Sequence, residues 1–431
     1  VAEYERHGAD KRLSDYKQYS ALLLQLYEKF DKYRLNEVFG SVDHFIDLSQ
    51  QLQADEACTQ ARALRINPKI AGYVFTQWND ASFEMTAGLV DPWRRPKKAF
   101  HSFKEVNSSL CIVIRPKKHS YYYGNSMEVE CNLVNENHIS CSAVMIITIY
   151  KEREVFDIIK QNITITGQEI QKVENVEELL AGIILPPGYY TIEARLCCNE
   201  NYYKTRFHII IFEPLYGEGR LVPYEPFGLD EKLLSCLEKW GFKPMTGSKL
   251  IICGEYSKAM IDRAIAGYTV LFVNPLTVND AGCIPEGVTI NTDVYMLGFY
   301  YYIRSSILCE GLPYSDIMGD IYAEVIPSAR LEYDNVKLPM AIDLIGVIAD
   351  CFVVRDEASL TPEQIVSGAL MGYGIVVFGN ETSIEVGAGI LSIPLGKGRI
   401  IYNMMKLVEN IGKVPIADKL LYNLLKYSTQ T

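Results

Sequence analysis

The sequence has eleven cysteines but no pair in the C-x-x-C spacing, and only Cys197 and Cys198 are close together. Zinc sites and the disulfide frameworks of secreted domains use regular cysteine spacings. The absence of such spacings argues against both, and no cluster of metal ligands stands out in the sequence. We therefore expect reduced thiols, a cytoplasmic protein, and neither a metal nor another cofactor.

Three further absences exclude broad classes of function. No run of eighteen apolar residues occurs, so the sequence predicts no membrane-spanning helix and no membrane partner. The net charge is −11 and there is no basic stripe with interleaved aromatic residues, which argues against a nucleic-acid partner. Glycine-containing stretches such as GAGILSIPLGKG lack the spacings of phosphate-binding loops.

The composition that remains is that of a globular protein, with 48% apolar and 22% charged residues. A chain of this length has room for about three domains. Its first residues, VAEYERHGADK, are typical of a strand end and the loop after it. We therefore expect the chain to be a piece of a longer polypeptide, with the N-terminal part as its partner.

Residues 1–107 alternate between helical and strand-like segments. Apolar residues follow a helical spacing from Leu13 to Phe30 and from Val42 to Ile66. An apolar, β-favouring strand begins at Ile70, and another helix is expected near Lys97 to Glu105. This order of elements predicts an alternating α/β unit.

Residues 108–213 have the pattern of an all-β domain. Turn-prone clusters such as YGNS, NENH and LPPG separate short segments of alternating or apolar character. The expected strands are CIVIRP, SMEVECNLVN, SAVMIITIYK, NITITG, YYTIEARLCC and KTRFHIIIFEP. Several short strands in sequence predict an immunoglobulin-like β-sandwich, which we expect to act as a spacer or interface.

Residues 214–431 alternate again between strands and helices. The expected strands are KLIICGE, YTVLFVN, MAIDLIGVIAD, YGIVVFGN and GRIIYNMM. The expected helices are Leu229–Trp240, Lys258–Ala266, Pro362–Met371 and Ile416–Tyr427. Such a βαβ pattern predicts a doubly wound, flavodoxin-like α/β domain.

The predicted strand from Ile70 ends in a polar cluster of Gln77, Trp78, Asn79 and Asp80. Polar residues at the C-terminal end of a buried parallel strand are where (β/α)8 barrels keep their chemistry. An indole face beside amide and carboxylate groups suits a sugar, because the C–H face of a sugar stacks on indole while its hydroxyls form hydrogen bonds. The alternative is that Trp78 is a core residue at an ordinary strand end.

The stretch GYVFTQWND, followed by Glu84, Gly88-Leu89, Asp91 and Arg95-Pro96-Lys97-Lys98-Ala99, resembles the last barrel strand and exit segment of family 2 glycoside hydrolases. That family includes β-galactosidases, β-glucuronidases and β-mannosidases. The resemblance implies that residues 1–107 are the last quarter of a (β/α)8 catalytic barrel, with a structural role for Glu84. A quarter of a barrel cannot close its sheet, so we expect residues 1–107 alone to aggregate and residues 108–431 to fold independently.

The start of the chain matches a second pattern of this family. The nucleophile of family 2 lies in a pattern close to E-[YF]-G-G-x-G, which Glu3, Tyr4 and Gly8 match. Glu5 and Arg6 stand where glycines are common, a departure that would narrow the sugar pocket or mark a catalytically lapsed copy. The resemblance implies that Glu3 is the catalytic nucleophile, and the alternative is a solvated terminal residue.

The resemblance also implies roles in substrate binding. Tyr4 and His7 would line the pocket, Trp78 would form its floor, and Asn79 and Asp80 would either hold sugar hydroxyls or brace the residues around them.

A retaining glycosidase also needs an acid/base carboxyl group about 5–5.5 Å from the nucleophile. In family 2 this group belongs to an Asn-Glu pair that precedes the nucleophile, whereas Asn36-Glu37 follows Glu3 and lies between two helical stretches. We therefore reject Glu37 and expect the acid/base residue outside this chain. Trp93 with Arg94 and Arg95 is expected to pack the barrel exit against the sandwich.

The last region resembles the glutamine-amidotransferase-like domain at the C-terminus of some sugar hydrolases. Cys253 stands where such an enzyme has its nucleophile, but no histidine follows His208, so the base is missing. The sequence thus predicts the C-terminal portion of a retaining β-glycoside hydrolase with a carbohydrate substrate. The alternative is a non-catalytic carbohydrate-binding or assembly subunit derived from such an enzyme, and a homo-oligomer would fit either function.

Overall fold

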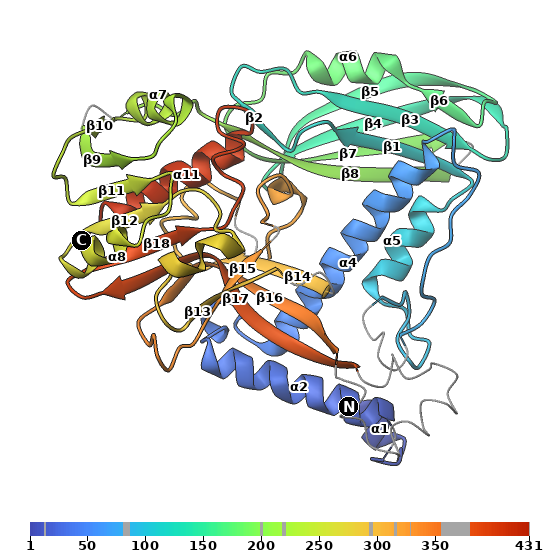
Figure 1. Cartoon of the computed structure of the whole chain (residues 1–431). Helices are drawn as coiled ribbons and strands as arrows, with labels where there is room; N and C mark the ends of the chain where they lie inside the picture. Colours follow the sequence, from blue (N-terminus) through green and yellow to red (C-terminus); the bar gives the residue numbers. More distant parts are fainter. Residues whose placement is uncertain are drawn as a thin grey trace.

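The computed structural model describes residues 1–12, 14–80, 87–198, 201–217, 221–292, 296–313, 317–327, 329–354 and 380–430. Within these ranges the chain forms three β-sheets and a set of helices (Figure 1). The mixed α/β and all-β character agrees with the predicted classes. The domain boundaries 1–107, 108–213 and 214–431 stay predictions.

The N-terminal residues are helical. The helices are α1 (Ala2–Arg6), α2 (Ser14–Lys32), α3 (Asn36–Phe39), α4 (Val42–Arg65) and α5 (Lys98–Val106). Helices α2, α4 and α5 confirm the three helices expected from the sequence. The Ser41 side chain caps α4 by accepting a hydrogen bond from the backbone N–H of His44. The helix ends just before Asn67-Pro68, where proline disfavours helical backbone in the preceding residue.

The strands predicted at Ile70 and at the start of the chain are wrong. Residues 2–6 are helical and residues 70–78 are irregular, with isolated bridges joining Asn79 to Val90 and Val90 to Pro96. A parallel strand needs neighbouring strands to pair its N–H and C=O groups, and none occurs among the described part of residues 1–107. The barrel therefore stays a prediction based on the resemblance.

The middle part of the chain forms two antiparallel-rich sheets. Their elements are β1 (Leu110–Pro116), β2 (Ser120–Tyr122), β3 (Val129–Asn135), β4 (Ser140–Lys151), β5 (Glu154–Thr166), β6 (Ile170–Lys172), α6 (Glu174–Ala181), β7 (Gly188–Cys198) and β8 (Asn201–Phe212). One sheet has the order β1-β3-β6 and the other β2-β8-β7-β4-β5. All six predicted strand segments are confirmed, and a shared apolar core lies between the sheets. The immunoglobulin-like assignment stays a prediction.

The C-terminal part forms a ten-stranded mixed sheet. Its elements are β9 (Val222–Phe227), α7 (Glu231–Lys239), β10 (Phe242–Pro244), β11 (Leu250–Cys253), α8 (Ala259–Ile265), β12 (Thr269–Phe272), η1 (Val278–Cys283), β13 (Val288–Asn291), β14 (Met296–Ile303), η2 (Asp320–Tyr322), β15 (Arg330–Tyr333), β16 (Ile342–Val354), β17 (Asn380–Leu395), β18 (Gly398–Asn403) and α11 (Pro415–Ser428). The predicted helix Pro362–Met371 and most of the predicted strand at 373–380 lie outside the described residues.

The ten-stranded sheet has a parallel half and an antiparallel half. Strands β10-β9-β11-β12-β18 are parallel, and in chain order they run 2-1-3-4-5, the order of flavodoxin-like sheets. Strands β13 to β17 pair antiparallel beyond β18, which the predicted doubly wound pattern did not include. The flavodoxin-like and amidotransferase-like assignments stay predictions.

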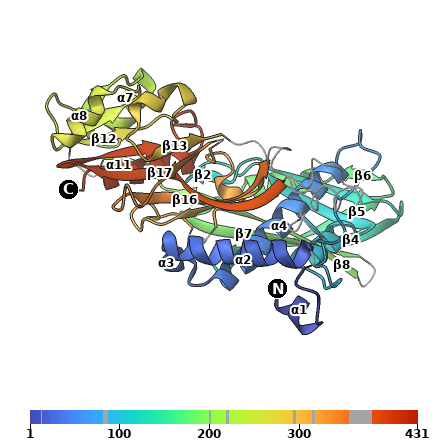
Figure 2. The ribbon, with the colours of Figure 1, turned by 60° about the horizontal axis from the view of Figure 1, so that its bottom comes forward.

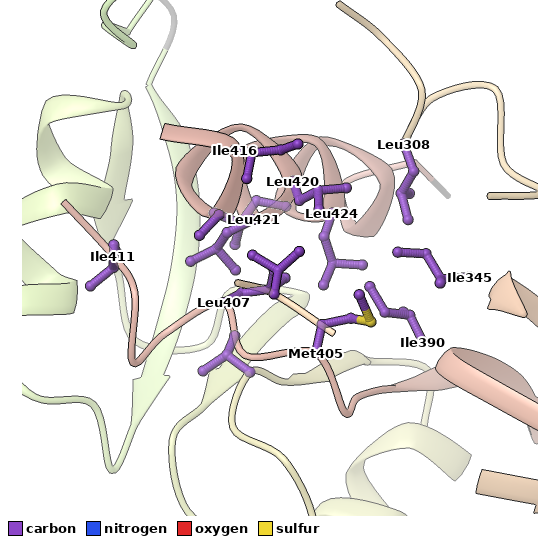
Figure 3. Close-up of a cluster of buried hydrophobic side chains, with 14 of the residues drawn as sticks. Leu308, Ile345, Ile390, Met405, Leu407, Ile411, Ile416, Leu420, Leu421 and Leu424 are labelled. Atoms are coloured by element: carbon purple, nitrogen blue, oxygen red, sulfur yellow. The ribbon is translucent and has the colours of Figure 1, made fainter. Parts of the chain in front are cut away.

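Helix α11 packs its apolar side over one face of this sheet. Figure 3 shows Leu424 of this helix pointing toward Met405 and Ile390, and all three side chains are fully buried. This core holds the C-terminal helix against the sheet.

Helices α2, α3 and α4 pack against strands β14, β16 and β17 of the same sheet (Figure 2). Phe39 lies within 5.3 Å of Tyr302 between ring centroids, and the Lys29 ammonium is 2.9 Å from the Glu385 carboxylate. Arg304 donates a hydrogen bond of 2.8 Å to the backbone carbonyl of Tyr33. Residues 14–65 therefore share an apolar core with the C-terminal part of the chain.

Candidate functional site

Glu3 lies in helix α1 and is held by cations from two parts of the chain. Its Oε1 accepts hydrogen bonds from Arg6 at 2.8 Å and from Arg95 at 3.0 Å. Its Oε2 lies 3.6 Å from Nε2 of His7, beyond hydrogen-bond distance. The Glu3 side chain is 20% exposed. Glu3 is therefore not a frayed, fully solvated terminal residue.

Three aromatic rings pack together beside Glu3. The Tyr4 ring meets the Trp93 indole edge to face, with centroids 4.6 Å apart. The His7 ring stacks on the same indole at 6.2 Å, and the Arg95 guanidinium lies 5.8 Å from its centroid. Trp93 was expected to pack against the sandwich, and these contacts place it against the N-terminal residues instead.

Arg95 joins Glu3 to a second carboxylate. Asp91 Oδ2 accepts a hydrogen bond of 2.6 Å from Nε of Arg95, and Asp91 Oδ1 accepts the backbone N–H groups of Trp93 and Arg95. Hydrogen bonds to Asp91 and Glu3 raise the pKa of the Arg95 guanidinium. The sequence pattern contained Asp91 and Arg95 but gave no signal that Arg95 would reach Glu3, because the two lie 92 residues apart.

Asp80 is a buried ion-pair partner. The Lys97 ammonium lies 3.0 Å from Oδ2 and 3.2 Å from Oδ1, and the backbone N–H of Gly88 donates to Oδ1 at 2.8 Å. Burial raises the pKa of the Asp80 carboxyl, although Lys97 opposes the rise. Asp80 thus braces the segment around Gly88. Asn79 donates its side-chain N–H to the backbone carbonyl of Asp80 at 3.1 Å.

Trp78 lies at the surface rather than in the core, with 55% of its area exposed. Its ring meets Phe100 edge to face at 5.9 Å. A small apolar hollow of about 400 Å³ lies beside it, with Phe75, Leu89 and Phe103 among its lining residues. The exposed indole face is available to a ligand.

The predicted site residues form two groups joined by residues 88–97. Glu3, Tyr4 and His7 contact Trp93 and Arg95. The other group is Trp78, Asn79 and Asp80, which pair with Leu89, Val90 and Lys97. The sequence match at Glu84 lies outside the described residues.

Glu37 is remote from this arrangement. It lies in the short helix α3, where it pairs with Arg34, and its Oε2 is 3.7 Å from Arg304 of the C-terminal part. Cys253 is also unsuited to nucleophilic chemistry, because it is 1% exposed and burial raises its pKa to about 12.

A second candidate site is a cleft of about 1320 Å³ between α4, the outer face of β7 and β8, and η2. On its sheet wall the Tyr189 and His208 rings stack with centroids 5.6 Å apart, and Thr191 Oγ1 lies 3.0 Å from Nδ1 of His208. Burial and the nearby Arg206 lower the pKa of His208 to about 4. The stacked pair therefore presents a neutral, flat surface at pH 7.

Charges of both signs line this cleft. They include Asp55, Asp320, Glu193, Arg62 and Arg206. Burial raises the pKa of Asp55, while the charges of Arg206 and Asp320 act on it in opposite directions. A mixed lining without a dominant sign suits a neutral, hydroxyl-rich ligand better than an ion.

The described residues contain neither a candidate metal site nor a candidate membrane-spanning helix. No group of three or more His, Cys, Asp or Glu side chains there is arranged to hold a metal ion. No helix in these ranges is long and apolar enough to cross a membrane.

No family model matches the chain, and no curated protein matches it. Solved structures overlap with parts of it. A glycosyl hydrolase family 2 member from Bacteroides cellulosilyticus has 12% identity over 38% of this chain and 25% of its own, with a TM-score of 0.19. The β-D-mannosidase from Dictyoglomus thermophilum has 14% identity over 42% of this chain and 21% of its own, with a TM-score of 0.31. The CARDB domain of a Pyrococcus furiosus protein has 14% identity over 24% of this chain and 94% of its own, with a TM-score of 0.18.

The chain thus spans about a quarter or less of the two glycosidases it overlaps with. The structural neighbours include family 2 glycosidases, as weak and partial similarities that stop short of a shared overall fold.

Proposed function

We propose that this chain is the C-terminal portion of a retaining β-glycoside hydrolase resembling family 2, with Glu3 as its nucleophile. The observation that carries the proposal is the hydrogen bond of 3.0 Å between Glu3 and Arg95. It joins the two segments that the resemblance singles out, although these lie at opposite ends of the first hundred residues.

The orientation of the carboxylate supports this role. Oε1 is occupied by Arg6 and Arg95, while Oε2 has no cation within hydrogen-bond distance in the contacts described above. Oε2 would attack the anomeric carbon and form a glycosyl ester, which water then hydrolyses. The acid/base carboxyl group would come from outside this chain.

The residue that departs from the family pattern would limit which sugars can bind. Arg6 stands where the family commonly has glycine, and its guanidinium binds Oε1 of Glu3. This contact fixes the carboxylate but also fills space that a glycine would leave to the sugar. Substrates with a small or absent substituent near the anomeric centre would fit best.

The alternative proposal is a non-catalytic carbohydrate-binding or assembly subunit. The cleft lined by Tyr189 and His208 favours it, because a flat neutral ring pair beside carboxylates and guanidinium groups can hold a sugar without cleaving it. A homo-oligomer would serve either proposal.

The two proposals differ in the effect of single substitutions on turnover of aryl β-glycosides by the complete polypeptide. Glu3→Gln keeps the shape of the side chain and removes its nucleophilic charge, so turnover should fall by several orders of magnitude with binding largely retained. Glu37→Gln is the matched control and should change turnover little. Trp78→Ala should lie between them, since one lost stacking contact is worth about 1–3 kcal/mol by analogy with base–aromatic stacking.

The order of the effects decides between the proposals. An inactive Glu37 variant beside an active Glu3 variant would refute the nucleophile assignment. A folded wild-type polypeptide that turns over none of a broad panel of glycosides would favour the binding subunit.

A further inference from the structure

Two cysteine sulfur atoms meet at one end of the five-stranded sheet. Sγ of Cys141 and Sγ of Cys198 are 2.8 Å apart, although 57 residues separate them in sequence. A disulfide bond needs about 2.0 Å between the sulfurs, so a small side-chain rotation would bring this pair to bonding distance. The other described cysteines include no second contact of this kind among the hydrogen-bonded pairs.

The register of the sheet explains why these two residues meet. Strand β4 pairs with β7 as far as Val144 opposite Cys197, and Cys141 and Cys198 lie just beyond that pair. Successive residues of a strand point to opposite faces, so Cys198 points into the sandwich core while Cys197 points outward. Cys141 lies on the core-facing side with Ala143, and both Cys141 and Cys198 belong to the same apolar cluster.

The two thiols differ in access. Cys198 is 5% exposed, whereas Cys141 is half-buried. A soluble oxidant therefore reaches Cys141 first. Cys197 is exposed but lies on the opposite face of β7, so it serves as an internal comparison for simple accessibility.

We propose that Cys141 and Cys198 form an oxidation site that closes into an intramolecular disulfide by exchange with a low-molecular-weight disulfide such as oxidised glutathione. The Cys141 thiolate attacks one sulfur of the oxidant, forming a mixed disulfide and releasing one glutathione thiolate. The Cys198 thiolate then attacks the Cys141 sulfur and releases the second. Two protein thiols are oxidised, one glutathione disulfide is reduced to two thiols, and the two protons lost by the protein pass to the released glutathione.

The closing step depends on pH. Burial, and after it the neighbouring Cys141, raise the pKa of Cys198 to about 11. Only the thiolate attacks, so the second exchange should be slow at pH 7 and should accelerate as the pH rises toward that value. A mixed disulfide on Cys141 should therefore accumulate first at neutral pH and disappear at pH 9.

The bond would link β4 to the end of β7. It would close a long loop in the unfolded chain and so restrict the unfolded ensemble more than the folded one. Oxidised protein should melt at a higher temperature than reduced protein. The geometry thus makes the stability of the sandwich dependent on the thiol–disulfide balance around it.

The test uses the whole chain, equilibrated with glutathione mixtures from fully reduced to fully oxidised at pH 8.5. Unreacted thiols are then alkylated under denaturing conditions, and the protein is analysed by mass spectrometry before and after digestion. We expect two fewer alkylated cysteines than the eleven of the sequence, and a cross-linked peptide pair containing Cys141 and Cys198. Oxidation should also raise the melting temperature.

Three variants make the result specific. Cys141→Ser and Cys198→Ala should both remove the cross-link and the shift in melting temperature, while Cys197→Ser should keep both. Should Cys198→Ala fail to fold, the wild-type peptide map and the Cys141→Ser variant still decide the question. Full alkylation under oxidising conditions, glutathione adducts without a cross-link, or a cross-link through Cys197 would each overturn the proposal.

Discussion

At the scale of single residues, the role of Asp80 depends on a partner elsewhere in the chain. The sequence placed Asp80 in a polar cluster suited to sugar hydroxyls. The structure buries it against Lys97, with both side chains 9% exposed. No local pattern predicts this burial, because it depends on the return of residues 88–97 over the cluster. Of the two roles left open for Asp80, these contacts favour bracing.

A substitution measures the strength of this bracing. Asp80→Asn removes the negative charge facing a largely buried ammonium group, and breaking such a pair typically costs about 3–5 kcal/mol of unfolding free energy. Lys97→Met added to Asp80→Asn should recover much of that loss, because it removes the other buried charge. Urea denaturation of the single and double variants gives the comparison.

The matched control is Asp91→Asn, since the Asp91–Arg95 pair is more exposed, at 22% and 55%. An exposed pair contributes about 0–1 kcal/mol. Equal losses of unfolding free energy for Asp80→Asn and Asp91→Asn would show that the buried pair stabilises the protein no more than the exposed pair does.

At the scale of elements, Phe39 in α3 holds the N-terminal helices to the large sheet. It is 2% exposed and meets the Phe45 and Tyr302 rings at 5.1 and 5.3 Å. Phe39→Ala should destabilise the protein by about 3–5 kcal/mol, the usual range for a buried phenylalanine. The measurement is the shift of the urea midpoint. Leu24→Ala on α2, where Leu24 is 60% exposed, should change stability by about 0.5 kcal/mol or less.

Some sequence signals are sufficient to predict an element of secondary structure, and others are not. Helices α2 and α4 were predicted because their apolar residues repeat at helical spacing, and this spacing needs no partner to be recognised. The segment at Ile70 has β-favouring residues but forms no strand, because a strand also requires a neighbour. Strand β17 was not among the predicted strands. Its segment GAGILSIPLGKG was weighed only as a phosphate-binding loop, whereas in the structure it is extended and pairs with β16 and β18.

At the scale of the whole molecule, the first part was expected to contain strands that its described residues lack, whereas the all-β and α/β character of the second and third parts was predictable from periodicity. The packing of the first part on the third was not. The ion pair between Lys29 and Glu385 joins residues 356 apart, and the backbone N–H of Ile384 donates to Gln25 across a similar interval. The pattern of apolar and polar residues within one segment does not predict its contacts with residues so far away in the sequence.

This packing changes the expectation for truncated chains. Residues 108–431 alone would expose the face of β16 and β17 that α2 and α4 cover, including Ile348 and Val386. We therefore expect this fragment to self-associate or to melt well below the whole chain, measured by size-exclusion chromatography and thermal unfolding. A monomeric fragment with the melting temperature of the whole chain would show that the helices add nothing to that core.

The most direct test of the central claim is to trap the covalent intermediate. The complete polypeptide is incubated with a panel of 2-deoxy-2-fluoro aryl β-glycosides, whose fluorine slows hydrolysis of the glycosyl ester, and the labelled peptide is identified by mass spectrometry. If Glu3 is the nucleophile, one member of the panel will add a single sugar to the peptide that carries Glu3, and Glu3→Gln will abolish the label. A sugar attached to any other carboxylate, or undiminished labelling of the Glu3→Gln variant, would contradict the assignment.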